Sequence, residues 1–180
     1  MSRILLKNDY CHASMNIALL GFAGEPAPGN LLHAAQMARS LARRQWRLLT
    51  GNFKGTMGIA LEHAHNSRAE TLLVTEKYQP LASGRYLSQV IYAENQSQKH
   101  DLIATLADAA VVIGGGKASL NLVNKLLKQR KPVFAIRCSG GITHHELPKE
   151  VLYYSETEDV LAVIERYLSI STETPLASHA

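Results

Sequence analysis

The stretch VVIGGGKASLN, residues 111–121, is the strongest indication of the fold class of this chain. An apolar run suited to a buried strand leads into three consecutive glycines, and Lys117 and Ser119 then stand at the start of an amphipathic segment. Glycines let a backbone approach a ligand closely, and the free N–H groups at a helix N-terminus attract anions. The stretch therefore predicts a strand, a phosphate-binding turn and a helix. It is not a P-loop, because the spacing GxxxxGK followed by Ser or Thr is absent.

Short apolar runs alternate with segments of helical periodicity on both sides of this turn. The predicted strands are residues 15–22, 47–52, 71–75, 88–94, 109–113, 132–136 and 151–155. The predicted helices are residues 30–45, a segment opening at 55, residues 97–106, the segment from the glycine turn to 131, and residues 157–169. Because such alternation forms right-handed crossovers, we expect an α/β fold, Rossmann-like and doubly wound, with a mostly parallel sheet and helices on both faces.

The chain of 180 residues is long enough to bury one core, and it shows no internal linker. We expect residues 1–14 to be an N-terminal extension, 15–170 a single domain, and 171–180 a disordered tail. No apolar run approaches the roughly 20 residues of a membrane span. The N-terminus also lacks the apolar stretch and cleavage site of a signal peptide, so we expect a cytoplasmic protein without a membrane partner.

The formal net charge is +4, but the basic residues are scattered along the chain. The one dense cluster, Lys125 to Lys131, falls at a predicted helix end, where cations complement the helix dipole. Nucleic acid binding would need a contiguous basic stripe, so we do not expect it. Mild positive charge suits a small anionic ligand equally well.

Two earlier strand ends also suit a ligand, because parallel sheets bind ligands beyond the carboxyl ends of their strands. The first, GFAGEPAPGN at residues 21–30, contains Gly21 and Gly24, although plain connecting loops have similar composition. The second is LLTGNFKGTMG at residues 48–58. In it Thr50 and Gly51 end the strand, Lys54 is placed to approach an anion, and Gly55 and Thr56 open the next helix. A tight connection with a chance lysine is the alternative explanation.

This second turn and the glycine turn together resemble the LOG-like superfamily. That superfamily includes the "lonely guy" phosphoribohydrolases, often mislabelled lysine decarboxylases, the molybdenum cofactor carrier proteins and the DNA-processing protein A group. Its pattern is a GG-x-x-G-x-M turn, then an Arg-bearing segment and a PGGxGTxxE turn. Here LLTGNFKGTMGIALEHA looks like the first turn, ADAAVVIGGGKASLNLV like the second, and KPVFAI like the strand that follows. The resemblance spans residues 15–136 and implies a Rossmann-like fold and a homodimer.

The catalytic positions of this family pattern are not kept. Ala118 stands in place of Gly, Ser119 in place of Thr, and the catalytic Glu falls on Leu122 or, with a one-residue shift, on Asn121. The family's Arg falls near Lys99, which keeps the charge but loses bidentate phosphate geometry. We therefore predict a carrier or sensor that binds a nucleotide-like or pterin-type phosphate ligand without catalysis, rather than an enzyme.

The residues predicted to contact this ligand all stand at strand ends or helix starts. They are Gly21, Gly24, Thr50, Gly51, Lys54, Gly55, Thr56, Lys99, Gly114, Gly115, Gly116, Lys117, Ala118, Ser119 and Asn121. No catalytic or metal-binding residue is assigned. No cofactor is firmly implied beyond a nucleotide or molybdopterin-type ligand, and the expected partners are this small-molecule phosphate compound and a second copy of the chain.

Two alternatives stay open. One is a nucleoside 5′-monophosphate phosphoribohydrolase, which hydrolyses an N-glycosidic bond, with its acid relocated to Glu94 or Glu62. The other is an interaction module whose pocket is vestigial. A metal site at Cys138 and the run HHE of residues 144–146 is not predicted, because the spacing matches no familiar site.

Overall fold

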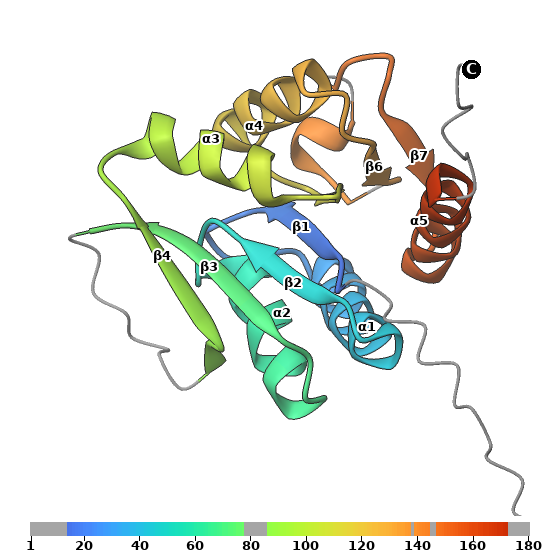
Figure 1. The fold of residues 1–180 in the computed structure, drawn as a ribbon, viewed down its shortest axis with the longest axis horizontal. Coiled ribbons are helices and arrows are strands. Elements are labelled where there is room, and N and C mark those ends of the chain that lie inside the picture. The colour runs from blue at the N-terminus through green and yellow to red at the C-terminus, as the bar shows by residue number, and fades with distance from the viewer. Residues whose placement is uncertain (1–13, 78–85, 138, 145–146, 173–180) are drawn as a thin grey trace, which may run out of the picture.

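A computed structural model describes residues 14–77, 86–137, 139–144 and 147–172. In these residues one sheet has the strand order β4-β3-β2-β1-β5-β6-β7, and every neighbouring pair is parallel (Figure 1). The strands are β1 (Asn16–Gly21), β2 (Arg47–Thr50), β3 (Thr71–Glu76), β4 (Gln89–Ala93), β5 (Ala109–Ile113), β6 (Val133–Ile136) and β7 (Leu152–Tyr154). The predicted α/β, Rossmann-like fold with a parallel sheet is confirmed.

Helices cover both faces of the sheet (Figure 1). On one face lie α1 (Pro28–Arg44), α2 (Gly55–Asn66) and α5 (Thr157–Thr172), and on the other lie α3 (Gln96–Leu106) and α4 (Lys117–Lys128). α1 begins two residues before the predicted start, since the fixed φ of Pro28 suits a first helical turn. α5 continues three residues past its predicted end. Most of the predicted N-terminal extension and tail lies outside the described residues.

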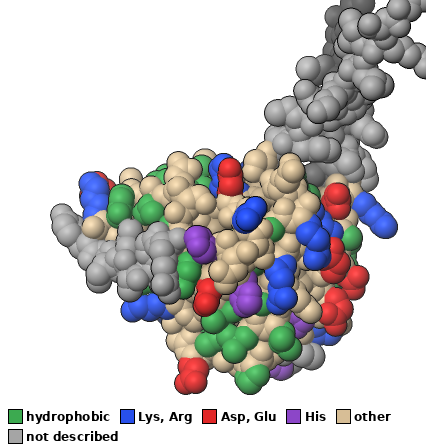
Figure 2. Space-filling view, turned by 90° about the horizontal axis from the view of Figure 1, so that it is seen from below, with side chains coloured by type: hydrophobic (Ala, Val, Ile, Leu, Met, Phe, Trp, Pro, Cys, Tyr) green, Lys and Arg blue, Asp and Glu red, His purple; other side chains and the backbone are tan. Residues whose placement is uncertain are grey.

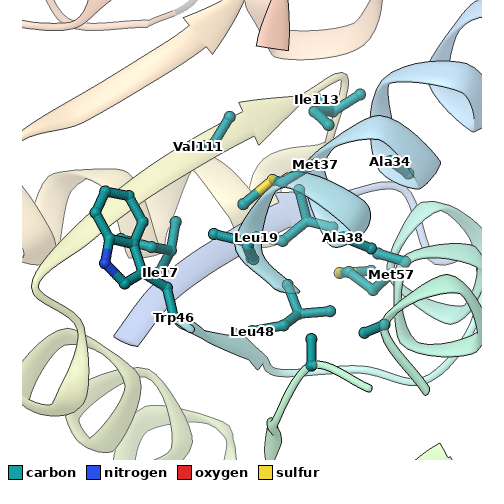
Figure 3. Packing of buried hydrophobic residues seen from close by; sticks show 14 of the residues in the cluster. Ile17, Leu19, Ala34, Met37, Ala38, Trp46, Leu48, Met57, Val111 and Ile113 are labelled. Atoms are coloured by element: carbon teal, nitrogen blue, oxygen red, sulfur yellow. The ribbon is translucent and has the colours of Figure 1, made fainter. Parts of the chain in front are cut away.

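The central strands bury both of their faces. Ile17 and Leu19 of β1 pack towards α1 and α2, whereas Ala18 and Leu20 pack towards α3 and α4, because successive side chains of a strand point to opposite sides. Figure 3 shows Met37 of α1 lying over Leu19 and its neighbours. Burial on both faces explains why these strands are continuous apolar runs rather than alternating ones.

The sheet order changes direction at the pair β1 and β5. β2, β3 and β4 follow β1 on one side, and β5, β6 and β7 lie on the other. At the carboxyl end of the pair, Gly21 stands opposite Ile113. The chain continues from β1 into α1 on one face and from β5 into α4 on the other, so the two connections separate at this point. In open α/β sheets, ligands bind at such a point.

The described surface carries charge of both signs. On the face shown in Figure 2, basic and acidic side chains are interspersed. No helix among the described residues is long and apolar enough to cross a membrane.

A polar network joins α5 to α1 at the edge of the domain. The buried Ser40 hydroxyl donates to Glu158 Oε2 over 2.6 Å, and Arg44 Nη2 donates to Glu158 Oε1 over 2.7 Å. The Ser40 hydrogen bond, followed by Arg44 and Arg43, holds the pKa of Glu158 below its usual value against an opposing effect of burial. The charged carboxylate is therefore the form that stabilises this contact.

We expect Glu158→Gln to lower the free energy of unfolding at pH 7 by less than about 1 kcal/mol, because the Glu158 side chain is 54% exposed. A carboxyl whose pKa is lowered by folding stabilises the protein above its unfolded pKa and loses that contribution as the pH falls through the folded pKa. The difference from wild type should therefore be full above the ordinary pKa of a glutamate, about 4.3, and should shrink progressively as the pH falls below it. Urea unfolding across this pH range measures it. The exposed Glu150→Gln is the control, and a difference that persists in acid would contradict the assignment.

Candidate functional site

A cavity of about 380 Å³ lies at the carboxyl ends of the central strands. Its walls come from the end of β1 and the loop after it, the loop after β2, the buried side of α3 and the first turns of α4. The predicted residues that line it are Gly21, Gly24, Gly51, Lys99, Gly116, Lys117, Ala118 and Ser119. The fold thus brings all three predicted turns to one crevice.

The other predicted residues do not line this cavity. Thr50 and Thr56 are buried behind its wall, with 1% and 0% exposure, and their hydroxyls have no hydrogen-bond partner among the described residues. Lys54 is exposed, with its Nζ 5.9 Å from the centre of the Phe53 ring. Asn121 faces an adjoining hollow instead. The remaining three, Gly55, Gly114 and Gly115, shape the backbone rather than the cavity surface.

Gly55 has this supporting role because the loop after β1 lies directly against it. A Cβ on Gly55 would lie 2.1 Å from the carbonyl oxygen of Phe22 and 2.5 Å from that of Gly24. Its φ of +58° is also a conformation that side chains rarely adopt. The N–H of Thr56 donates to the same Phe22 oxygen over 3.0 Å. The start of α2 therefore fixes the loop that forms one rim of the cavity.

The glycine turn after β5 is held by a hydroxyl that the sequence analysis missed. Ser139, 5% exposed, accepts a hydrogen bond from the Gly114 N–H over 2.8 Å and donates one to the Ile136 carbonyl over 2.7 Å. Asn30 Nδ2, at the start of α1, donates to the Ser139 carbonyl over 2.9 Å. Both side chains are distant in sequence from the turn they hold, and no local motif marks them.

The first turn of α4 offers unpaired backbone donors to the cavity. Gly116 occupies the N-cap with no side chain, and the first intrahelical hydrogen bond runs from the Leu120 N–H to its carbonyl over 3.0 Å. The N–H groups of Lys117, Ala118 and Ser119 therefore have no acceptor within the helix. Together with the positive end of the helix dipole and the exposed Lys117, they form an anion-binding surface.

Two basic side chains of α3 complete the wall. Lys99 has 12% of its side chain exposed, and its Nζ lies 2.8 Å from Glu76 Oε1, so its charge is partly neutralised. His100, which the sequence analysis did not identify, is 7% exposed. Burial, and next the positive charges of Lys99 and Lys125, lower the pKa of His100, so its ring is uncharged at neutral pH.

The rest of the wall is mainly apolar and was largely unforeseen. Leu122, 6% exposed, lines the cavity where the resemblance places the family's Glu. The other unpredicted lining residues are Leu19, Leu20, Phe22, Ala23, Asn52, Met57, Gln96 and Ile103. No Asp or Glu belongs to the lining within the described part of the chain. Glu62 and Glu94 are exposed elsewhere, and Glu94 pairs with Lys77.

The histidine-rich loop after β6 is described only in part. Cys138, His145 and Glu146 lie outside the described residues. Within the residues that are described, no three His, Cys, Asp or Glu side chains form a group suited to a metal ion.

The domain is Rossmann-like and has a ligand-sized crevice at its topological switch point. Comparison with known proteins identifies the family to which it belongs. The model of the SLOG cluster4 family matches residues 14–164, and the chain belongs to that family. The predicted membership of the LOG-like superfamily is thereby confirmed.

Solved structures share the fold. The molybdenum cofactor binding protein of the phototrophic bacterium Rippkaea orientalis is 20% identical, with a TM-score of 0.76, over 87% of this chain and 99% of that one. The molybdenum cofactor carrier protein of Chlamydomonas reinhardtii is 20% identical, with a TM-score of 0.72, over the same shares.

One relative is similar in sequence. The 1-deoxy-D-xylulose-5-phosphate synthase of Shewanella putrefaciens is 30% identical over 125 residues, which are 68% of this chain and 19% of that protein. The chain thus spans about a fifth of that relative's length.

We expect Gly55→Ala to destabilise the protein by more than about 1 kcal/mol, since alanine strains a positive φ and its Cβ would collide with the Phe22 carbonyl. Gly29→Ala is the matched control, because Gly29 lies in the first turn of α1 with open space around it. Urea unfolding of both variants measures the difference. Equal effects would mean that the rim of the cavity is not held by this close approach.

Proposed function

We propose that this protein binds a nucleotide-like or pterin-type phosphate compound in the cavity and does not hydrolyse it, as a carrier or sensor. The observation that supports this most directly is the composition of the wall. It combines helix N–H donors and cations with apolar side chains, and its described part contains no carboxylate. A volume of about 380 Å³ falls within the usual range for small-molecule sites.

The polar part of the cavity wall suits the phosphate of such a ligand, and the apolar part suits its ring. A phosphate fits the first turn of α4, where Lys117 adds a positive charge to the N–H donors. A flat ring fits between the apolar side chains of β1 and those of Ile103 and Leu122. Phe22, 38% exposed at the rim, adds an aromatic surface on which a ring can stack.

The same wall argues against hydrolysis. Cleavage of an N-glycosidic bond builds positive charge on the sugar and protonates the departing base, which carboxyl groups support. Leu122 can do neither, and the acids considered as replacements, Glu62 and Glu94, lie outside the cavity. The fold shared with a molybdenum cofactor binding protein and a molybdenum cofactor carrier protein supports a pterin-type ligand as one of the two classes. A cytoplasmic homodimer, implied by the LOG-like resemblance and the sequence, is part of this proposal.

We expect AMP or molybdopterin to raise the melting temperature of the wild-type protein, since a ligand at 100 times its Kd stabilises by about 2.7 kcal/mol. Gly116→Asp should abolish that shift, because the carboxylate repels the phosphate and occupies the same N–H donors. The empty variant should stay folded, since Asp is a favoured N-cap and Gly116 has open space around it. Gly116→Ala is the uncharged control and should still bind. Thermal unfolding with each compound measures these outcomes. No shift with either compound would refute the proposal.

We expect no release of adenine or ribose 5-phosphate when AMP is incubated with the protein, because no carboxylate of the described wall can act on the glycosidic bond. Chromatographic separation of the reaction mixture measures both products. A boiled sample sets the background. Release above that background would replace the carrier or sensor with a phosphoribohydrolase whose acid lies elsewhere.

A further inference from the structure

A second hollow, of about 470 Å³, adjoins the cavity on the outer side of α3 and α4. Gln96 and His100 line both spaces, so this part of α3 borders each of them. The opposite side of the hollow consists of Asn121, Asn124, Lys125 and Lys128 from successive turns of α4.

The chemistry of this hollow differs from that of the cavity. Its described lining residues are Gln, Ser, His, Asn and Lys, which present both their polar groups and the carbon atoms of their side chains to the hollow. None of these residues is apolar or acidic. Lys125 Nζ is held by Asp101 and by the Ser97 carbonyl, whereas Lys128 is exposed and forms no ion pair with a described residue. The hollow therefore suits a polar, negatively charged group rather than a ring.

His100 stands at the junction of the two spaces. It is 7% exposed, and its side chain lines both the cavity and the hollow. The charged groups around it are Lys99 and Asp101 on α3, Lys125 on α4 and Glu76 on β3. A ligand that passes from the cavity into the hollow would contact this ring.

We propose that the hollow is a second subsite for the same ligand, which is a nucleotide-like or pterin-type compound extended by a second phosphate-bearing group. The first phosphate lies at the start of α4, the ring lies in the apolar cavity, and the extension passes His100 towards Asn124 and Lys128. This inference rests on the proposed function. It also gives Asn121, predicted to bind ligand yet absent from the cavity wall, a place beside the extension.

The test is titration calorimetry of the full chain with two probes, AMP and ADP-ribose, the second of which carries a further phosphate and a ribose. We expect ADP-ribose to bind the wild-type protein at least tenfold more tightly than AMP, which corresponds to one or two additional hydrogen bonds to charged groups. The double variant Asn124→Leu, Lys128→Glu should lose that advantage and keep its affinity for AMP. Lys149→Glu, an exposed charge reversal outside both spaces, should change neither.

A second measurement reports on His100 itself. The carbon-13 signal of its ring, assigned with His100→Gln, should move on addition of ADP-ribose and move less with AMP. Equal affinities for the two probes, or an equal loss of both in the double variant, would overturn the second subsite while leaving the proposed function intact. Failure of both probes to bind would overturn the subsite together with nucleotide binding at the cavity.

Discussion

The site depends on how closely three backbone segments approach one another at the junction of β1 and β5. The loop after β1 lies on the start of α2, where only Gly55 fits beneath the Phe22 and Gly24 carbonyls. On the other side, a Cβ on Gly141 would lie 2.2 Å from the Gly115 carbonyl. These contacts are between main-chain atoms, which cannot move aside as a side chain can. The path of the main chain therefore fixes the crevice, and it also fixes the positions of the residues that line the crevice.

A few buried polar contacts keep that path unique. The Ser139 hydroxyl accepts from the Gly114 N–H, and Asn30 donates to the Ser139 carbonyl, so the glycine turn is connected through Ser139 to the segment after β6 and to α1. Such groups are costly to bury without partners, which penalises any alternative arrangement of the turn. A turn held by such contacts is preorganised, which lowers the entropy that ordering on binding would cost.

Much of the fold could be predicted because its signals are local. The period of apolar residues located the strands and most helix bounds, and the glycine turn located the carboxyl ends of the strands. The positions of Asn121 and Leu122 depended on helical phase, since consecutive residues differ by about 100° around an α-helix. Leu122, Val123 and Leu126 are the buried residues of α4, so their spacing in the sequence indicates which side of the helix faces the protein interior. Ser139 and His100 carry no such signal, because their roles arise from contacts between segments distant in the chain.

The bare N-cap of α4 has a consequence for the lifetime of the protein. Without a side chain at Gly116, the protein forgoes about a few tenths of a kcal/mol that Ser or Asp would give at such a position. An anion of the proposed ligand would supply acceptors for these N–H groups, so ligand-bound molecules would unfold less often than free ones. Since cellular proteases remove unfolded chains, the quantity of intact protein would follow the supply of its ligand. The cellular concentration of the protein would then indicate how much ligand is available.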